Sequence, residues 1–273
     1  MYNRLIDENE LNSKENSMIS NYHTHTRWCR HGTGEIEDYI SKAIELGMKE
    51  IAITEHVPLK GNPDSSRMLF EEFNAYNREF DQVIEKYQEQ INIIKGFEAE
   101  YYPEEMEWYR YLREVRGYEL FVLGQHRSDR RGGIDYFAPK GEREIRLYGD
   151  KVIEGLSTGF FDILAHPDMF LTNHYNGRLD EVSKETMKKI FKTCEKENVP
   201  VEINANGFRT GRPYPNQDIF QISKEYDLRY LINADAHDPK ALGDEYILEA
   251  ERFAESLGIR ADAFLKNLCE VCY

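Results

Sequence analysis

The sequence contains few cysteines and no long hydrophobic run. Its four cysteines, at positions 29, 194, 269 and 272, are too few and too scattered to form a disulfide framework. Residues 1–17 are polar and charged and lack the apolar core of a signal peptide, and no apolar segment is long enough to cross a bilayer. We therefore expect a cytoplasmic protein that has no membrane as partner.

Positive charge is also scarce. The chain has 35 Lys and Arg against 50 Asp and Glu, which gives a formal net charge of -15. Such a protein repels the phosphate backbone of nucleic acid unless it carries a local basic stripe, and Arg127, Arg130 and Arg131 form only a small group. We therefore expect no nucleic acid as partner. An anionic substrate would need local positive charge, which bound metal ions would supply.

Linkers and repeats are absent as well. No Pro-, Gly- or Ser-rich segment and no internal repeat divides the 273 residues, and barrel folds of this length usually form one domain. We expect residues 1–17 to form a flexible N-terminal extension and residues 18–273 a single domain. Cys269 and Cys272 have the spacing of a redox or zinc pair. However, they follow a helical apolar pattern without a second pair, so we interpret them as two thiols on a last helix.

Short strand-like runs alternate with longer helical patterns along the chain. Ile51-Ala-Ile53 and Phe121-Val-Leu123 are apolar without a break, as expected of strands that are buried on both faces. Apolar residues recur at helical spacing in residues 36–44, between an expected N-cap at Thr33 and a closing Gly47. Similar helical patterns occupy residues 73–87, 145–156, 187–194 and 219–226. The predicted strands are residues 18–22, 50–54, 91–97, 119–123, 161–165, 199–203 and 230–233.

This alternation predicts an α/β fold with parallel strands and right-handed crossovers. Seven of the eight histidines lie just beyond strand-like runs. An open doubly wound sheet gathers ligands at one or two switch points, whereas a closed or nearly closed ring brings the C-terminal ends of all strands around one centre. We therefore predict a TIM-like (β/α) barrel of about seven strands, with its site at the C-terminal ends of the strands.

The polar clusters at these strand ends have the composition of a metal site. Neutral imidazole is the commonest metal ligand among side chains, and His23 and His25 suit chelation of one ion because alternate residues of a strand face the same side. Glu98 can bridge two ions because a carboxylate offers two oxygens. Nine groups at three or four bonds per ion fit two or three metal ions, with positions left for water and substrate. The predicted ligands are His23, His25, His31, His56, Glu98, His126, His166, Asp235 and His237.

As a set, these clusters resemble the successive motifs of the PHP (polymerase and histidinol phosphatase) superfamily. The resemblance extends from about residue 20 to about residue 240. The chain is most similar to the monofunctional histidinol-phosphate phosphatases in its length, its Thr-Glu-His form and its Gly-Phe-Glu-Ala-Glu-Tyr segment. The motifs are Asn21-Tyr-His-Thr-His-Thr26, Thr54-Glu-His56, Gly96-Phe-Glu98, Gly124-Gln-His126, Ala165-His-Pro-Asp168 and Asn233-Ala-Asp-Ala-His237.

The resemblance implies a distorted seven-stranded barrel that holds three ions, usually a mixture of zinc, manganese and iron. It also implies how the ligands are shared, with Glu98 bridging the first two ions. The three implied sets are His23, His25, Glu98 and Asp235; Glu98, His126 and His166; and His31, His56 and His237.

Such a site suits hydrolysis of a small phosphorylated metabolite. Metal ions lower the pKa of bound water to near 7, and a hydroxide held between the first two ions would attack phosphorus in line. Fixed positive charge would meet the charge of the transition state. The resemblance implies that the reaction converts L-histidinol phosphate to L-histidinol and phosphate, a step of histidine biosynthesis. Asp168 is a candidate acid or ligand support, or equally a turn residue after Pro167, and Glu100 is close enough to Glu98 to touch substrate.

The phosphate group should also meet an arginine, because the planar guanidinium matches two phosphate oxygens. Arg209 is the first choice, since its segment resembles the arginine-bearing loop of the family, and Arg127 and Arg212 follow. Arg209→Ala is then expected to raise KM or lower kcat/KM. Histidinol-phosphate phosphatases commonly carry an arginine shortly after the His-x-Asp motif, whereas here residues 169–173 contain none. Another small phosphomonoester therefore stays open as substrate.

Three other functions agree less well with the sequence. A nuclease of the same fold would need a surface that binds nucleic acid, which the acidic balance disfavours. A structural zinc protein would have a closed, cysteine-rich site. Amide or lactone hydrolysis on a metal-binding barrel often uses a bridging lysine, and Glu98 takes that place here. The oligomeric state is not predicted by the sequence.

Overall fold

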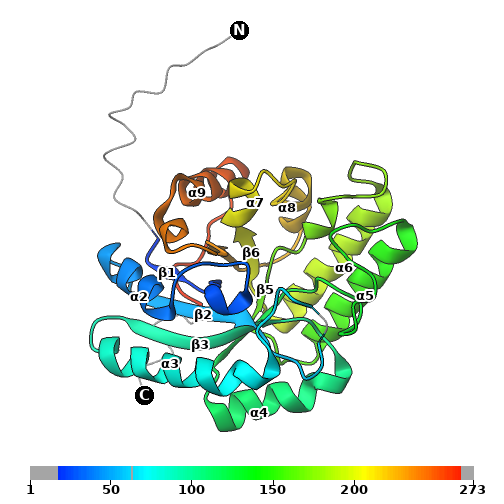
Figure 1. The fold of residues 1–273 in the computed structure, drawn as a ribbon. Helices are drawn as coiled ribbons and strands as arrows, with labels where there is room; N and C mark the ends of the chain where they lie inside the picture. The colour runs from blue at the N-terminus through cyan, green and yellow to red at the C-terminus, as the bar shows by residue number, and fades with distance from the viewer. Residues whose placement is uncertain (1–17, 63, 266–273) are drawn as a thin grey trace.

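The computed structural model describes residues 18–62 and 64–265. Seven parallel strands lie in chain order in one sheet, and helices surround them (Figure 1). The predicted TIM-like (β/α)7 barrel is therefore confirmed. The expected extension 1–17 and the thiols of Cys269 and Cys272 lie outside the described residues. The strands are β1 (Ser20–Asn21), β2 (Glu50–His56), β3 (Asn92–Ala99), β4 (Leu120–Leu123), β5 (Ile163–Leu164), β6 (Val201–Asn204) and β7 (Tyr230–Asn233).

Side-chain amides complete the ring between its first and last strands. Asn21 Oδ1 accepts a hydrogen bond from the backbone N of Ala234 at 2.7 Å, and Asn233 Oδ1 accepts one from the backbone N of Tyr22 at 2.9 Å. Beyond the C-terminal ends of β1 and β7, Thr24 and Ala236 form a further parallel bridge. The two asparagines replace the backbone pairing that the short β1 cannot supply, so the C-terminal ends of β1 and β7 meet.

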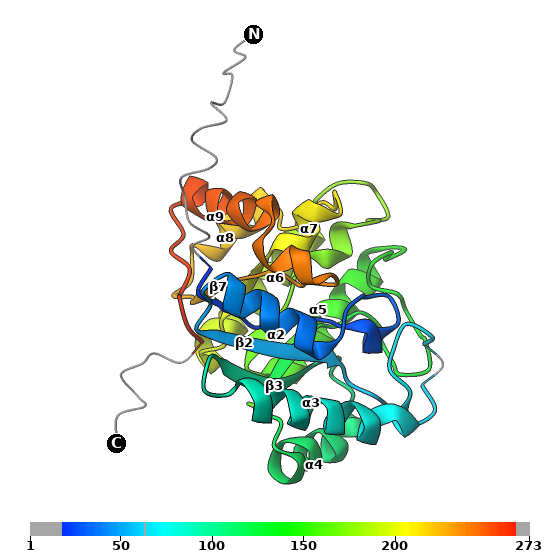
Figure 2. The ribbon, with the colours of Figure 1, turned by 60° about the vertical axis from the view of Figure 1, so that its left-hand side comes forward.

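Helices form the outer layer of the barrel, and α2 and α3 cover β2 and β3 (Figure 2). Helix α2 begins after Glu35 rather than Thr33, because Glu35 and Asp38 form a reciprocal capping box. The apolar pattern of α9 was not predicted. No helix among the described residues is long and apolar enough to span a membrane. The α-helices are α2 (Ile36–Glu45), α3 (Phe73–Tyr87), α4 (Met106–Arg116), α5 (Glu142–Ser157), α6 (Glu181–Glu197), α7 (Ala205–Arg209), α8 (Gln217–Ser223) and α9 (Glu245–Leu257).

The interior of the barrel changes from apolar to polar along the strands. Alternate residues of a strand face the same side, so Ala52, Thr54 and His56 of β2 follow one another along the inner face. The N-terminal part of the interior is a small buried apolar cluster: Tyr22, Ala52, Leu120, Val122, Ile163, Ala165 and Leu231. The C-terminal part holds buried imidazoles, carboxylates and amides. The buried polar groups therefore lie next to this apolar cluster, at the C-terminal ends of the strands.

Gly124, which follows β4, is required by this packing. A Cβ atom at Gly124 would lie 1.9 Å from Oε1 of Glu98, closer than any two such atoms approach. The absence of a side chain at Gly124 gives the Glu98 carboxylate its place at the centre of the barrel. This is the physical reason for glycine in the Gly124-Gln-His126 motif.

Candidate metal centre

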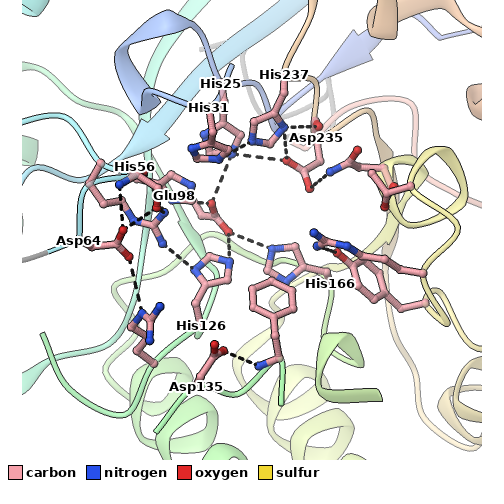
Figure 3. A pocket seen from close by; sticks show the side chains of 18 residues that line it. His25, His31, His56, Asp64, Glu98, His126, Asp135, His166, Asp235 and His237 are labelled. Atoms are coloured by element: carbon pink, nitrogen blue, oxygen red, sulfur yellow. Dashed lines mark hydrogen bonds and ion pairs between the residues drawn. The ribbon is translucent and has the colours of Figure 1, made fainter. Parts of the chain in front are cut away.

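The nine predicted ligands converge at the C-terminal ends of the strands, although they come from widely separated parts of the sequence. His23 is fully buried beneath a cavity of about 400 Å³, and the other eight line that cavity (Figure 3). His25, His31 and His237 lie on one side of Glu98, and His126 and His166 on the other. The structure thus brings together every residue that was proposed as a ligand.

Glu98 occupies the centre of this group. Its Oε2 atom lies 2.9 Å from Nδ1 of His56 and 3.3 Å from Nε2 of His25. Its Oε1 atom lies 3.0 Å from Nε2 of His166 and 3.3 Å from Nε2 of His126. Because each oxygen faces different imidazoles, the Glu98 carboxylate has the position of a bridge between two ligand sets.

The imidazoles of His31 and His237 show most directly that the site fits a cation. Nδ1 of His31 lies 2.8 Å from the carbonyl O of Cys29, and Nδ1 of His237 lies 3.0 Å from that of Asp235. A carbonyl oxygen only accepts, so both Nδ1 atoms carry the proton and both Nε2 atoms keep a lone pair. These Nε2 atoms are 3.0 Å apart. Two facing lone pairs repel each other, whereas a divalent ion binds both.

The ligand atoms of the described residues also fall into compact groups that match the implied sets in part. Within each group all ligand atoms lie within 4.8 Å of one another. One group, His31, His56 and His237, reproduces an implied set, and another, His23, His25 and Glu98, contains three of the four members of the first set. Two others, His56, Glu98 and His126, and His23, His166 and Asp235, join residues of different implied sets. The arrangement is thus continuous, as expected when ions share ligands.

Two buried carboxylates that were not predicted lie beside the histidines that follow β1, and one of them, Glu202, is hydrogen-bonded to its histidine. Oε1 of Glu202 lies 2.7 Å from Nδ1 of His23, and Oε2 of Glu202 accepts from the backbone N of His166 at 2.9 Å. Oε2 of Glu55 lies 3.7 Å from Nδ1 of His25. A carboxylate on the far ring nitrogen fixes the tautomer and orientation of a metal-binding histidine. The sequence could have indicated these carboxylates, because a charged residue stands inside an otherwise apolar strand, as in Val201-Glu-Ile203.

The backbone is strained at two of the predicted ligands. His166 has φ 24° and Asp235 has φ 43°, in the left-handed region that residues other than glycine rarely adopt. Neighbouring groups hold both segments, because Glu202 binds the backbone N of His166 and Asn21 binds that of Ala234. Strain of this kind is typical of functional sites. It turns both side chains from the ends of β5 and β7 toward the cavity.

Electrostatics keep the carboxylates ionised and three imidazoles neutral. Burial by itself raises the pKa of Glu98 and of Asp235, but the surrounding imidazoles outweigh it and hold both pKa values well below their usual range. Burial lowers the pKa of His31, His56 and His237, the last to about 3. Near neutral pH these three rings are unprotonated, which is the form that binds a metal ion.

The structure does not bring Arg209, the first choice for phosphate, into the cavity wall. Its Nε and Nη2 atoms donate to Asp244 at 2.6 and 3.0 Å, and further donors bind the carbonyls of Ala234 and Ala241 at 2.9 and 3.1 Å. Its donors are therefore committed to joining α7 to the start of α9. Arg209 has the contacts of a structural clamp, and its assignment to phosphate is not supported by this position.

We expect Arg209→Ala to lower stability rather than phosphate affinity. The substitution leaves the Asp244 carboxylate and two carbonyls without their donor, which costs about 2 kcal/mol. In a chain of this size the melting temperature should fall by about 4–8 °C. Thermal unfolding checks the first part, and the KM of the metal-loaded variant checks the second. A large increase in KM with an unchanged melting temperature would return Arg209 to the phosphate site.

The other two predicted arginines do line the cavity. Arg127 lies 3.6 Å from Oδ2 of Asp64, and Arg212 is exposed and donates to the Tyr214 hydroxyl at 2.8 Å. A third arginine in the wall, Arg67, was missed by the sequence analysis. Its only sequence signal was its position in the loop that follows His56.

The two predicted supporting acids lie in different surroundings. Glu100 is buried behind a ligand, and its Oε1 atom is 3.1 Å from Nδ1 of His126. Asp168 is buried and does not line the cavity. Its Oδ2 atom accepts from the backbone N of Asn216 at 2.6 Å, and burial raises the pKa of Asp168 to about 7. Asp168 therefore ties the end of β5 to the loop that carries Tyr214.

Comparison with known proteins places this geometry in a family. Residues 21–206, more than half of the chain, match the model of the PHP domain. The chain belongs to the PHP domain family. The resemblance that the sequence motifs indicated is therefore confirmed. The match begins in β1 and ends in α7, so the PHP domain includes seven of the nine predicted ligands, while Asp235 and His237 follow it.

Named relatives of this PHP domain protein cover most of its length. A protein of Schizosaccharomyces pombe named "Probable histidinol-phosphatase" is 26% identical over 267 residues, which are 87% of this chain and 86% of that protein. A protein of Deinococcus radiodurans with the same name is 25% identical over 231 residues, which are 81% of this chain and 87% of that protein.

A solved structure shares the fold. The crystal structure of histidinol phosphate phosphatase from Lactococcus lactis, complexed with Zn, L-histidinol and phosphate, matches with a TM-score of 0.70 at 16% identity. The match covers 89% of this chain and 95% of that one. This similarity supports the seven-stranded barrel described above.

Proposed function

We propose that this protein is a metal-dependent phosphomonoesterase that hydrolyses L-histidinol phosphate to L-histidinol and phosphate. The observation that carries the proposal is the pairing of imidazole Nε2 atoms around Glu98, at 3.1 Å for His23 and His25 and at 3.0 Å for His31 and His237. Where two Nε2 lone pairs face each other, as in His31 and His237, a cation between them removes their repulsion. The names of two relatives, each aligned with more than four fifths of the chain, support the substrate.

We further propose that two or three ions, drawn from zinc, manganese and iron, are held by the nine predicted ligands. When bound, such ions lower the pKa of water and offset the negative charge of a phosphate group. Glu98 would connect two of the sites, and Glu202 would keep His23 in the tautomer that presents Nε2. The donor set of imidazoles and carboxylates suits all three metals.

The rest of the cavity suits a small leaving group. Its volume of about 400 Å³ is in the range of small-molecule pockets. Phe137 stacks on His126 with ring centroids 5.4 Å apart and offers an aromatic face. Burial raises the pKa of Tyr214, whose hydroxyl accepts from Arg212, so the Tyr214 proton is retained for donation to a substrate oxygen.

The proposal is tested by measuring inorganic phosphate released from a panel of phosphomonoesters by metal-loaded protein. We expect the highest kcat/KM for L-histidinol phosphate. A higher kcat/KM for another small phosphomonoester would support the proposed reaction but show that the substrate is different. Cleavage of single-stranded DNA without phosphate release from any monoester would contradict the proposal. The Glu98→Gln variant, purified in the same way and supplied with the same metals, is the matched control for contaminating phosphatases.

A further inference from the structure

One charged side chain in the cavity wall has no role in the site described so far. Arg67 lies in the loop between β2 and the 3-10 helix η2 (Phe70–Glu72), and only 8% of its surface is exposed. It lines the metal-site cavity and also a neighbouring cavity of about 290 Å³. The guanidinium therefore lies in the wall of both cavities. A buried guanidinium is costly unless it is paired, so its contacts indicate its purpose.

The contacts of Arg67 hold both Nη atoms in place but leave the Nε donor free. Nη1 donates to the carbonyl O and to Oγ of Ser66 at 3.2 and 3.3 Å, and Nη2 donates to Oε1 of Glu100 at 3.2 Å. The same Glu100 oxygen lies 3.1 Å from Nδ1 of His126. One carboxylate oxygen is thus shared between Arg67 and His126. Both Nη atoms of Arg67 have partners, whereas among residues 18–62 and 64–265 no group accepts a hydrogen bond from its Nε atom.

Arg67 is also close to the predicted ligands. Nη2 lies 3.4 Å from Nδ1 of His126, the ring whose Nε2 atom faces Glu98. The positive charge of Arg67 contributes to the lowered pKa of His56, after burial. An anion that binds between the metal ligands and this wall would therefore meet the guanidinium directly.

The other arginines near the cavity are less suited to this role. Arg209 donates its hydrogen bonds to Asp244 and two backbone carbonyls, and it does not line the cavity. Arg212 is exposed, and it already donates to Tyr214 and lies over the Phe137 ring at 5.1 Å. The side chain of Arg127 is 35% exposed, so water screens its charge. Of these four arginines, Arg67 alone combines burial, a free Nε donor and contact with a predicted ligand.

We propose that Arg67 binds the phosphate group of the substrate, and that Glu100 holds the guanidinium in position for this. The ligand class is a phosphate dianion, either a phosphomonoester or inorganic phosphate, and the proposal rests on the proposed phosphomonoesterase function. A planar guanidinium can donate two parallel hydrogen bonds to two phosphate oxygens. In a wall that excludes water these charge-assisted bonds are stronger than at the surface. Arg67 thereby provides the local positive charge that an acidic chain needs.

The test uses the variants Arg67→Met and Arg67→Lys of the metal-loaded protein. Binding of inorganic phosphate is measured by calorimetry and as competitive inhibition of phosphomonoester hydrolysis. We expect the affinity for phosphate to fall about ten- to a hundredfold in Arg67→Met, as for loss of a charge-assisted hydrogen bond. Arg67→Lys should lose most of the same affinity, because an ammonium has no planar fork. Bound metal should stay at the wild-type level in both variants.

A matched control comes from the far side of the neighbouring cavity. Arg130 donates to the carboxylate of Glu105 and to the carbonyl O of Lys60, but it does not line the metal-site cavity. Arg130→Met removes the same charge and similar contacts, and phosphate affinity should stay within about twofold of wild type. An equal loss in this control would mean that net charge, rather than contact with Arg67, attracts phosphate, and it would overturn the proposal.

A double variant separates binding from neutralisation of Glu100. If Arg67 only balances the buried Glu100 carboxylate, then Arg67→Met combined with Glu100→Gln restores phosphate affinity, and the proposal is overturned. If Arg67 contacts phosphate, the double variant binds phosphate as weakly as Arg67→Met. Failure of the function itself gives a different result. Protein that binds phosphate through Arg67 but hydrolyses no monoester contradicts the phosphatase, whereas hydrolysis with unchanged phosphate binding in Arg67→Met contradicts this inference alone.

Discussion

Glu98→Gln is expected to abolish turnover and to lower the metal content of the purified protein. The amide keeps the size of the side chain but loses its charge and one of its two acceptor oxygens. Both oxygens of Glu98 face imidazoles at 2.9 to 3.3 Å, so no other side chain can replace the bridge. We expect kcat to fall at least a hundredfold, the loss typical of one essential electrostatic group. Phosphate release and elemental analysis measure the two effects.

Two controls accompany this prediction. Glu104→Gln makes the same chemical change at an exposed residue of the 3-10 helix η3 (Pro103–Glu105), and it should leave activity and metal content unchanged. Thermal unfolding of Glu98→Gln shows whether the variant is folded. A folded Glu98→Gln protein with full metal content and wild-type activity would contradict the bridging role.

Removal of the metals should inactivate the protein and also destabilise it. Ions that bind only the folded chain stabilise it by about 3 kcal/mol when present at a hundred times their dissociation constant. Chelation should therefore lower the melting temperature by about 6–12 °C. It also leaves the facing Nε2 atoms of His31 and His237 without a cation between them.

The measurement compares untreated, chelated and reconstituted protein by thermal unfolding and by phosphate release. Zinc, manganese or iron should restore both properties together, and the metal that restores the highest kcat identifies the functional ion. Magnesium is a useful control because it prefers oxygen ligands and keeps several of its waters. Metal-free protein with an unchanged melting temperature and full activity would contradict both this prediction and the proposed metal site.

The barrel could be predicted because its signals are local. Unbroken apolar runs such as Phe121-Val-Leu123 indicate strands buried on both faces, and each of the seven predicted strands overlaps an observed one. The cap of α2 and the whole of α7 and α9 were missed. A capping box between Glu35 and Asp38 competes with a nearby threonine, and single-chain patterns do not show which of two such residues begins a helix.

The residues of the site also divide into those that the sequence predicted and those that it did not. Ligands such as His23, Glu98 and His166 could be proposed because strand ends of a parallel ring meet, whatever the loops do. The supporting carboxylates Glu55 and Glu202 could not, since a charged residue within a strand shows neither which face it takes nor which partner it meets.

The sequence by itself determined the fold class, the family and the set of groups that converge, because strand periodicity and the polar residues at strand ends depend on nearest neighbours along the chain. Only the tertiary structure decided which arginine is free for an anion. Arg209 finds Asp244 thirty-five residues away, while Arg67 folds back beside Glu100 and His126. A guanidinium has five donors and binds whichever acceptors surround it, and those acceptors come from loops whose packing no local pattern records.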